Sequence, residues 1–155
     1  MLEVGQSAPE FKLQSTSGET ISLADYRGKN IVLYFYPKDM TPGCTTEACD
    51  FRDNHSKFAE VNTVVLGISP DPVEDHQKFT EKHELPFPLL ADTEHEVAEA
   101  YGVWQLKKNF GKEYMGIVRS TFVIDQNGKI AKIWPKVKVE GHVQEVYDFI
   151  KESLS

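Results

Sequence analysis

The chain alternates between short apolar runs and longer segments in which apolar residues recur every three or four positions. Residues 31–36 and 63–68 are continuous β-branched and aromatic runs, typical of strands buried on both faces of a sheet. Between them, residues 45–60 place Ala48, Phe51 and Phe58 at helical spacing, which predicts one helix packed on that sheet. Because strand-helix-strand connections are almost always right-handed crossovers, we expect the two strands to be parallel.

Two hairpins are predicted on either side of this unit. Apolar and polar residues alternate before and after residues 15–18, which indicates a short hairpin near the N-terminus. Asn127-Gly128 joins two strand-like runs at residues 120–125 and 129–134, and an Asn-Gly pair in that setting favours a tight antiparallel turn. The sheet is therefore expected to be mixed.

Further helices are predicted from end signals and apolar spacing. Asp71 is expected to cap a helix that has Pro72 at its first position and runs towards His83. Similar patterns predict helices over residues 93–101 and 143–154. The elements sum to an α/β fold with a mixed central sheet flanked by helices and an N-terminal β-hairpin extension.

Length and charge restrict the classes of function. With 155 residues, the chain has the usual size of one domain, so we expect residues 1–155 to fold as a single domain. A net charge of −7 lacks the basic footprint that nucleic acid or an anionic membrane surface requires, and we expect neither as a partner. The N-terminus resembles no signal peptide and no apolar run approaches the roughly 18 residues of a membrane span, so we expect a cytoplasmic protein.

The first of the two cysteines, Cys44, follows a predicted buried strand and opens the predicted helix. The unpaired N–H groups and the positive dipole end of a helix N-terminus favour a thiolate over a thiol. Thr41 is placed to point a hydroxyl towards this sulfur, and Pro37 and Pro42 would stiffen the loop. These features favour an activated thiol, although a small, inert, buried residue is the commoner role of a free cysteine and remains the alternative.

The second cysteine, Cys49, lies five residues further along the same predicted helix. An intact helix would separate the two Cα atoms by about 8–9 Å, beyond the ~7 Å within which a disulfide forms. A bond between Cys44 and Cys49 would therefore require the first turns of the helix to unwind. Polar Thr45, Thr46 and Glu47 are expected to make that unwinding less costly than an apolar turn would; inert burial of Cys49 is again the alternative.

Cations and metal ligands are scarce around these cysteines. Arg119 directly precedes the strand predicted at residues 120–125 and is the preferred cationic partner for Cys44, with an ordinary surface ion pair as the alternative. The five histidines show no three- or four-residue pairing and no Cys-x-x-Cys is present, so no metal site is predicted.

Several spaced motifs now resemble one known family. Pro37-x-x-x-Thr41-x-x-Cys44 is similar to the active-site signature of the peroxiredoxins, and the segment from Cys44 to Cys49 resembles the bacterioferritin comigratory protein, or peroxiredoxin Q, subfamily. Further similar motifs are Gly5-x-x-Ala8-Pro9-x-Phe11, Tyr34-Phe35-Tyr36-Pro37, Arg119-Ser120-Thr121-Phe122 and Val137-x-Val139-x-Gly141-His142. The resemblance spans the chain and implies a thioredoxin-like fold.

The resemblance also implies a mechanism. Cys44 would be the peroxidatic cysteine, which reduces hydrogen peroxide or an organic hydroperoxide and becomes a sulfenic acid. Thr41, Arg119 and the backbone N–H groups of Gly43 and Cys44 would bind the peroxide, and Pro37 would shield it. Cys49 would be the resolving cysteine, forming an intramolecular disulfide that thioredoxin reduces.

The same resemblance sets the expected assembly and the alternatives. No further cysteine lies near the C-terminus, so the two-subunit disulfide of dimeric relatives is not available and we expect a monomer. No haem, flavin or metal motif appears, and sulfur chemistry requires no cofactor. A thioredoxin-fold thiol-disulfide oxidoreductase would predict Cys-x-x-Cys at the helix start, whereas a non-catalytic acidic binding module would consume no peroxide.

Overall fold

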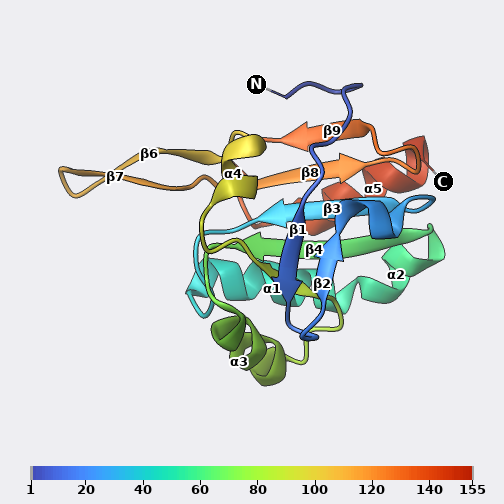
Figure 1. The fold of residues 1–155 in the computed structure, drawn as a ribbon. Coiled ribbons are helices and arrows are strands. Elements are labelled where there is room, and N and C mark those ends of the chain that lie inside the picture. The colour runs from blue at the N-terminus through green and yellow to red at the C-terminus, as the bar shows by residue number, and fades with distance from the viewer. Residues whose placement is uncertain (1, 155) are drawn as a thin grey trace.

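The computed structural model describes residues 2–154, which form a seven-stranded sheet covered by helices on both faces, with a separate two-stranded ribbon (Figure 1). The strand order is β2-β1-β5-β4-β3-β8-β9. The strands of the sheet are β1 (Lys12–Ser15), β2 (Thr20–Ser22), β3 (Asn30–Phe35), β4 (Thr63–Ser69), β5 (Leu89–Ala91), β8 (Ser120–Ile124) and β9 (Ile130–Trp134). The helices are η1 (Leu23–Tyr26), α1 (Pro42–Asp53), α2 (His55–Glu60), α3 (Val73–His83), α4 (Glu96–Ala100) and α5 (His142–Ser153). The mixed α/β class predicted from the sequence is confirmed.

The central crossover and both predicted hairpins are present. Strands β3 and β4 pair in parallel, with Ile31 opposite Val64 and Phe35 opposite Ile68. Strands β1 and β2 pair antiparallel, as do β8 and β9. Strand β8 also lies antiparallel to β3. This pairing makes the sheet mixed and brings the start of β8 beside the end of β3.

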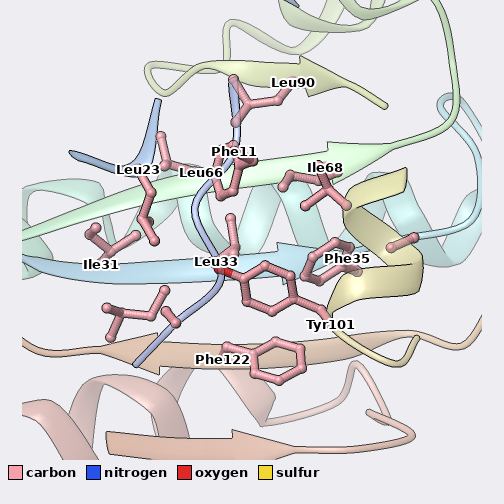
Figure 2. Packing of buried hydrophobic residues seen from close by; sticks show 14 of the residues in the cluster. Phe11, Leu23, Ile31, Leu33, Phe35, Leu66, Ile68, Leu90, Tyr101 and Phe122 are labelled. Carbon is pink, nitrogen blue, oxygen red and sulfur yellow. The ribbon is translucent and has the colours of Figure 1, made fainter. Parts of the chain in front are cut away.

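The core has two layers because β3 sends alternate side chains to opposite faces of the sheet. Ile31, Leu33 and Phe35 pack in one cluster with residues of the N-terminal hairpin and α4, as Figure 2 shows for Phe11, Tyr101 and their neighbours. Val32, Tyr34 and Tyr36 face the other cluster, which residues of α1, α2, α3 and α5 complete. Strand β3 is buried along its whole length, as its continuous apolar run predicts.

Two predicted helices have different boundaries. The helix expected over residues 45–60 is two helices, because Asn54 leaves the helical conformation (φ −108°, ψ 8°) and its side chain donates to the Asp50 carbonyl at 2.8 Å. Pro72 is the N-cap of α3 rather than its first residue, and Asp71 does not cap it. The Asp71 carboxylate instead accepts from the Ser69 hydroxyl (2.6 Å) and the Asp39 N–H (2.8 Å).

The sequence patterns predicted neither β5 nor the ribbon of β6 (Trp104–Asn109) and β7 (Lys112–Ile117). The ribbon projects away from the sheet (Figure 1). Most of its side chains are exposed. At its tip, Phe110 has a left-handed φ of 51° and is 96% exposed. This conformation favours Gly or Asn, so a phenylalanine at this position does not indicate a turn in the sequence.

Among residues 2–154, each helix is too short or too polar to cross a bilayer.

Candidate active site

The candidate site lies where β3 ends and α1 begins. Thr41 is the N-cap of α1, Pro42 occupies its first turn, and Cys44 follows two residues later, only 2% exposed. Proline is favoured at this position because it lacks the N–H that a first helical turn leaves unpaired. The N–H groups of Gly43 and Cys44 belong to that same turn, so Cys44 sits at the positive end of the α1 dipole.

Arg119 reaches this turn from the residue before β8. Its Nη2 atom donates to Cys44 Sγ at 3.3 Å, and its side chain is 17% exposed. Gly43 permits the approach, because a Cβ atom at this position would lie 3.2 Å from Arg119 Nη2. The structure thus joins Cys44 with the cation that the sequence favoured as its partner.

Glu47 is a third member of the site, and the sequence reasoning missed its role. Arg119 Nη1 donates to Glu47 Oε1 at 2.6 Å, and the Glu47 side chain is fully buried. Burial raises the pKa of Glu47 to about 7, against the lowering effect of the Arg119 charge. Glu47 is also three residues after Cys44, on the same helical face, which was the available signal.

The burial of Glu47 corrects one expectation. Glu47 was expected to make unwinding of the first helical turns less costly because it is polar. In the structure, its carboxylate is instead held in a buried ion pair, and its Oε2 atom has no hydrogen-bond partner. Unwinding must therefore break the contact with Arg119, and it also brings this unpaired oxygen into water.

The Arg119 guanidinium is shared between two acidic groups. Burial by itself lowers the pKa of Arg119, but the neighbouring Glu47 and Cys44 charges outweigh burial and raise it. The charged guanidinium places N–H donors beside Sγ. It also supplies a donor for negative charge that develops on an oxygen near the sulfur.

Thr41 and Pro37 lie in the loop before α1. The Thr41 hydroxyl donates to the Lys38 carbonyl at 2.8 Å, which closes the loop on itself. Within residues 2–154, the Thr41 hydroxyl does not hydrogen-bond to the Cys44 sulfur, towards which it was expected to point. Pro37 is half-buried and lies two residues after the end of β3. Both residues therefore border the Cys44 turn, and the Thr41 hydroxyl would have to change partner to reach the sulfur.

A buried polar cluster anchors the same loop to α3. Asp39 accepts from the Tyr36 hydroxyl (2.6 Å) and lies 2.6 Å from His76 Nδ1. His76 Nε2 lies 3.0 Å from the Leu90 carbonyl. A carbonyl only accepts, so the contact with Leu90 requires Nε2 as the donor. The cluster fixes Asp39 five residues before Cys44.

Two residues of this cluster, together with Asp71, have the spacing of metal ligands. They form the one such group in the part of the chain that the structure describes. One atom each of Asp39, Asp71 and His76 lies within 4.8 Å of the others. These atoms already hydrogen-bond one another, Tyr36 or the backbone. These hydrogen bonds hold the loop before α1 in place, and this is the role that they indicate for the cluster.

Cys49 occupies the middle of α1 and is half-buried, and both cysteines are free. The predicted placement of the two cysteines on one helix is confirmed. Since α1 is intact from Pro42 to Asp53, the separation of about 8–9 Å expected for Cα atoms five helical residues apart applies.

His142 gives the protein a defined pH response near the site. Its Nε2 atom lies 2.8 Å from the Thr121 hydroxyl. Burial lowers the pKa of His142 from 6.5 to about 4; Glu145 opposes this shift and Arg119 adds to it. The neutral ring therefore stabilises the fold fully above pH 6.5, and that contribution is lost as the pH falls through 4.

We expect His142→Gln to weaken the acid sensitivity of folding. Between pH 7.5 and 4, the parent protein should lose about 3 kcal/mol of unfolding free energy that the variant does not lose. Urea unfolding at a series of pH values measures this difference. Glu47, with its raised pKa, acts in the opposite direction between pH 4.5 and 7, so the variant and the parent must be compared at each pH. Identical pH profiles would contradict the assignment.

Comparison with known proteins identifies the class. The AhpC/TSA family matches residues 4–133. Peroxiredoxin Bcp of Bacillus subtilis (strain 168) is 63% identical over 151 residues, which are 97% of this chain and 96% of the relative. Peroxiredoxin Bcp of Escherichia coli (strain K12) is 44% identical over 151 residues, 97% of each chain.

Solved structures agree with these relatives. A point mutant of PrxQ from Xylella fastidiosa superposes with a TM-score of 0.95 at 34% identity, covering 100% of this chain and 99% of the other. Peroxiredoxin Q of Xanthomonas campestris gives a TM-score of 0.90 at 37% identity, covering 94% and 92%.

The fold, the Cys44 turn and these similarities define a thiol peroxidase with a thioredoxin-like fold, whose family acts on hydroperoxides. The chain belongs to the AhpC/TSA family, among the peroxiredoxins of the Bcp or peroxiredoxin Q type. The resemblance predicted from the spaced motifs is confirmed.

Proposed function

We propose that Cys44 is the peroxidatic cysteine and that the protein reduces hydrogen peroxide and organic hydroperoxides. The Cys44 thiolate attacks the terminal peroxide oxygen; the O–O bond breaks, water or an alcohol leaves, and Cys44 becomes a sulfenic acid. The observation that carries this proposal is the 3.3 Å contact of Arg119 Nη2 with a buried sulfur at a helix N-terminus. The bacterioferritin comigratory protein of Xanthomonas campestris, similar to this chain, has alkyl peroxide reduction activity.

Substrate binding is assigned to the groups around that sulfur. Arg119 and the N–H groups of Gly43 and Cys44 orient the peroxide and stabilise charge on its oxygens as the O–O bond breaks. Thr41 contributes its hydroxyl after releasing the Lys38 carbonyl, and Pro37 limits access of water. Glu47 holds the guanidinium in place through its 2.6 Å contact.

Cys49 is proposed to resolve the sulfenic acid as an intramolecular disulfide, which thioredoxin reduces. Both cysteines lie on α1, so resolution needs no second chain, and we propose a cytoplasmic, single-domain monomer. Thioredoxin acts by thiol-disulfide exchange on the exposed disulfide. The α1 turns between the two sulfurs must unwind before the disulfide forms.

The test is turnover coupled to NADPH oxidation through thioredoxin reductase and thioredoxin, with hydrogen peroxide or cumene hydroperoxide as substrate. We expect Cys49→Ser to form the Cys44 sulfenic acid at the parental rate in a single turnover, yet to lose at least about tenfold in thioredoxin-dependent turnover. Hydrogen exchange of residues 45–51 should also rise when the parent, but not the variant, is oxidised. Parental recycling in Cys49→Ser would contradict the resolving role.

A further inference from the structure

Cys49 faces a histidine that the peroxidatic step does not use. His83 is the last residue of α3, 34 positions further along the chain, and its Nδ1 atom lies 3.9 Å from Cys49 Sγ. Both side chains are half-buried. The contact therefore places an imidazole nitrogen against the sulfur proposed to carry out resolution.

Two contacts hold His83 in this position, one to its ring and one to its backbone. Its ring packs edge-to-face on Phe79, with centroids 5.4 Å apart and an interplanar angle of 82°. Arg52 Nη1 donates to the His83 carbonyl at 2.8 Å, which ties the second half of α1 to the end of α3. These contacts keep His83 next to Cys49. Cys44 lies about one and a half helical turns away, in the first turn of α1.

We propose that His83 is the general base of the resolving step, an inference that rests on the proposed resolving role of Cys49. His83 Nδ1 takes the proton of the Cys49 thiol, and the thiolate attacks the sulfur of the Cys44 sulfenic acid. The S–S bond forms as the S–O bond breaks, and the leaving hydroxide takes up the proton held by His83, which gives water and returns His83 to its neutral form. Cys49 sulfur is oxidised and Cys44 sulfur is reduced, and the oxidising equivalent comes from the peroxide consumed in the first step.

A base is useful here because the thiolate, not the thiol, is the nucleophile, and an ordinary cysteine is mainly protonated at neutral pH. Imidazole is the side chain best suited to take a proton near pH 7. Cys44 has the helix N-terminus and Arg119 to favour its thiolate, whereas Cys49 lies in the middle of the helix and lacks the dipole contribution.

The other charged residues near Cys49 and His83 belong to types that do not titrate near neutral pH. On α1 they are Arg52, Asp50 and Asp53; Lys82 lies in the last turn of α3, and Glu84 is the C-cap of that helix. Hydrogen bonding to Asp53 raises the pKa of Arg52, with a further contribution from Cys49. The Arg52 guanidinium therefore stays charged at every physiological pH. Of these neighbours, His83 is the one whose type titrates near neutrality.

The test uses His83→Asn in the full-length protein, because the asparagine amide occupies the place of Nδ1 without titrating. Reduced protein is mixed with one equivalent of hydrogen peroxide from pH 5.5 to 9, quenched in acid, and analysed by intact mass for sulfenic acid and disulfide. We expect disulfide formation at pH 7 to slow by at least about tenfold and to recover towards pH 9. His55→Asn is the matched control, since His55 is also half-buried against a phenylalanine, Phe87.

A second measurement removes any dependence on unwinding of α1. In Cys44→Ser protein, the rate of Cys49 alkylation by iodoacetamide reports its thiolate directly, and His83→Asn should change how this rate depends on pH. His83→Gln serves as a second variant, with circular dichroism as the check on folding. Parallel pH profiles of variant and parent in both measurements would overturn the role of His83 and leave Arg52 as the activating charge. Parental recycling in Cys49→Ser would instead overturn the resolving role itself.

Discussion

Replacing Cys44 with serine is expected to lower peroxide reduction by about 10⁴-fold or more, because the nucleophile is lost. A serine hydroxyl is not ionised by a helix N-terminus and one guanidinium, so Arg119 would have no thiolate to assist. The measurement is peroxide consumption by the reduced variant, followed both in the thioredoxin-coupled assay and directly without reductase.

Cys49→Ser is the matched control for this substitution, since it removes the same kind of atom from the same helix. It should keep the first oxidation, whereas Cys44→Ser should lose it. A Cys44→Ser protein that consumed peroxide as fast as the parent would show that the chemistry lies elsewhere in the chain, whereas a parent protein that consumed no peroxide would favour the non-catalytic binding role.

Arg119→Gln should slow the oxidation of Cys44 by about 10²–10³-fold, the usual effect of removing one donor from a charge-stabilising site. The change removes the 3.3 Å contact with Sγ and the 2.6 Å contact with Glu47. Stopped-flow oxidation of the reduced protein by hydrogen peroxide measures the rate. Raising the pH should restore only part of it, because the variant regains the thiolate but not the donor to the peroxide oxygen.

Arg27→Gln is a suitable control for the loss of a guanidinium. Arg27 forms an exposed ion pair with Glu10, and pairs of this kind contribute little to stability. Its replacement should leave Cys44 oxidation unchanged. An Arg119→Gln protein with the parental oxidation rate would contradict the role of Arg119, provided that its circular dichroism spectrum shows a folded chain.

The fold was predictable where a residue pattern repeats over a whole element. The apolar runs of β3 and β4 and the helical stripe of α5 are such cases. The three-residue strand β5 is too short for a period to appear. The ribbon tip escaped because Phe110 adopts a conformation that its residue type disfavours. The helix break at Asn54 depends on one side-chain hydrogen bond that apolar spacing does not reveal.

The positions of Cys44 and Arg119 in the candidate site were predictable, and those of the residues around them were less so. Position relative to the strand and helix ends was enough to select Cys44 and Arg119. Glu47 was misjudged because a glutamate in a polar turn is normally solvent-exposed. The contacts of Asp39 with His76, and of Cys49 with His83, join residues more than 30 positions apart in the chain. Such pairs depend on how α3 packs against its neighbours, which local spacing does not encode.

The contacts that α3 makes with Asp39 and Arg52 also affect how quickly α1 refolds after each catalytic cycle. Asp39, which precedes the Cys44 turn, contacts His76 of α3. Arg52, in the second half of α1, donates to the carbonyl of His83 at the end of α3. The proposed unwinding therefore frees a short segment whose two ends stay in place. Such a segment keeps few alternative conformations, and helix regrowth takes about nanoseconds per residue. After the disulfide is reduced, refolding of this segment should be far faster than the exchange reaction with the reductant, so conformational recovery should not limit turnover.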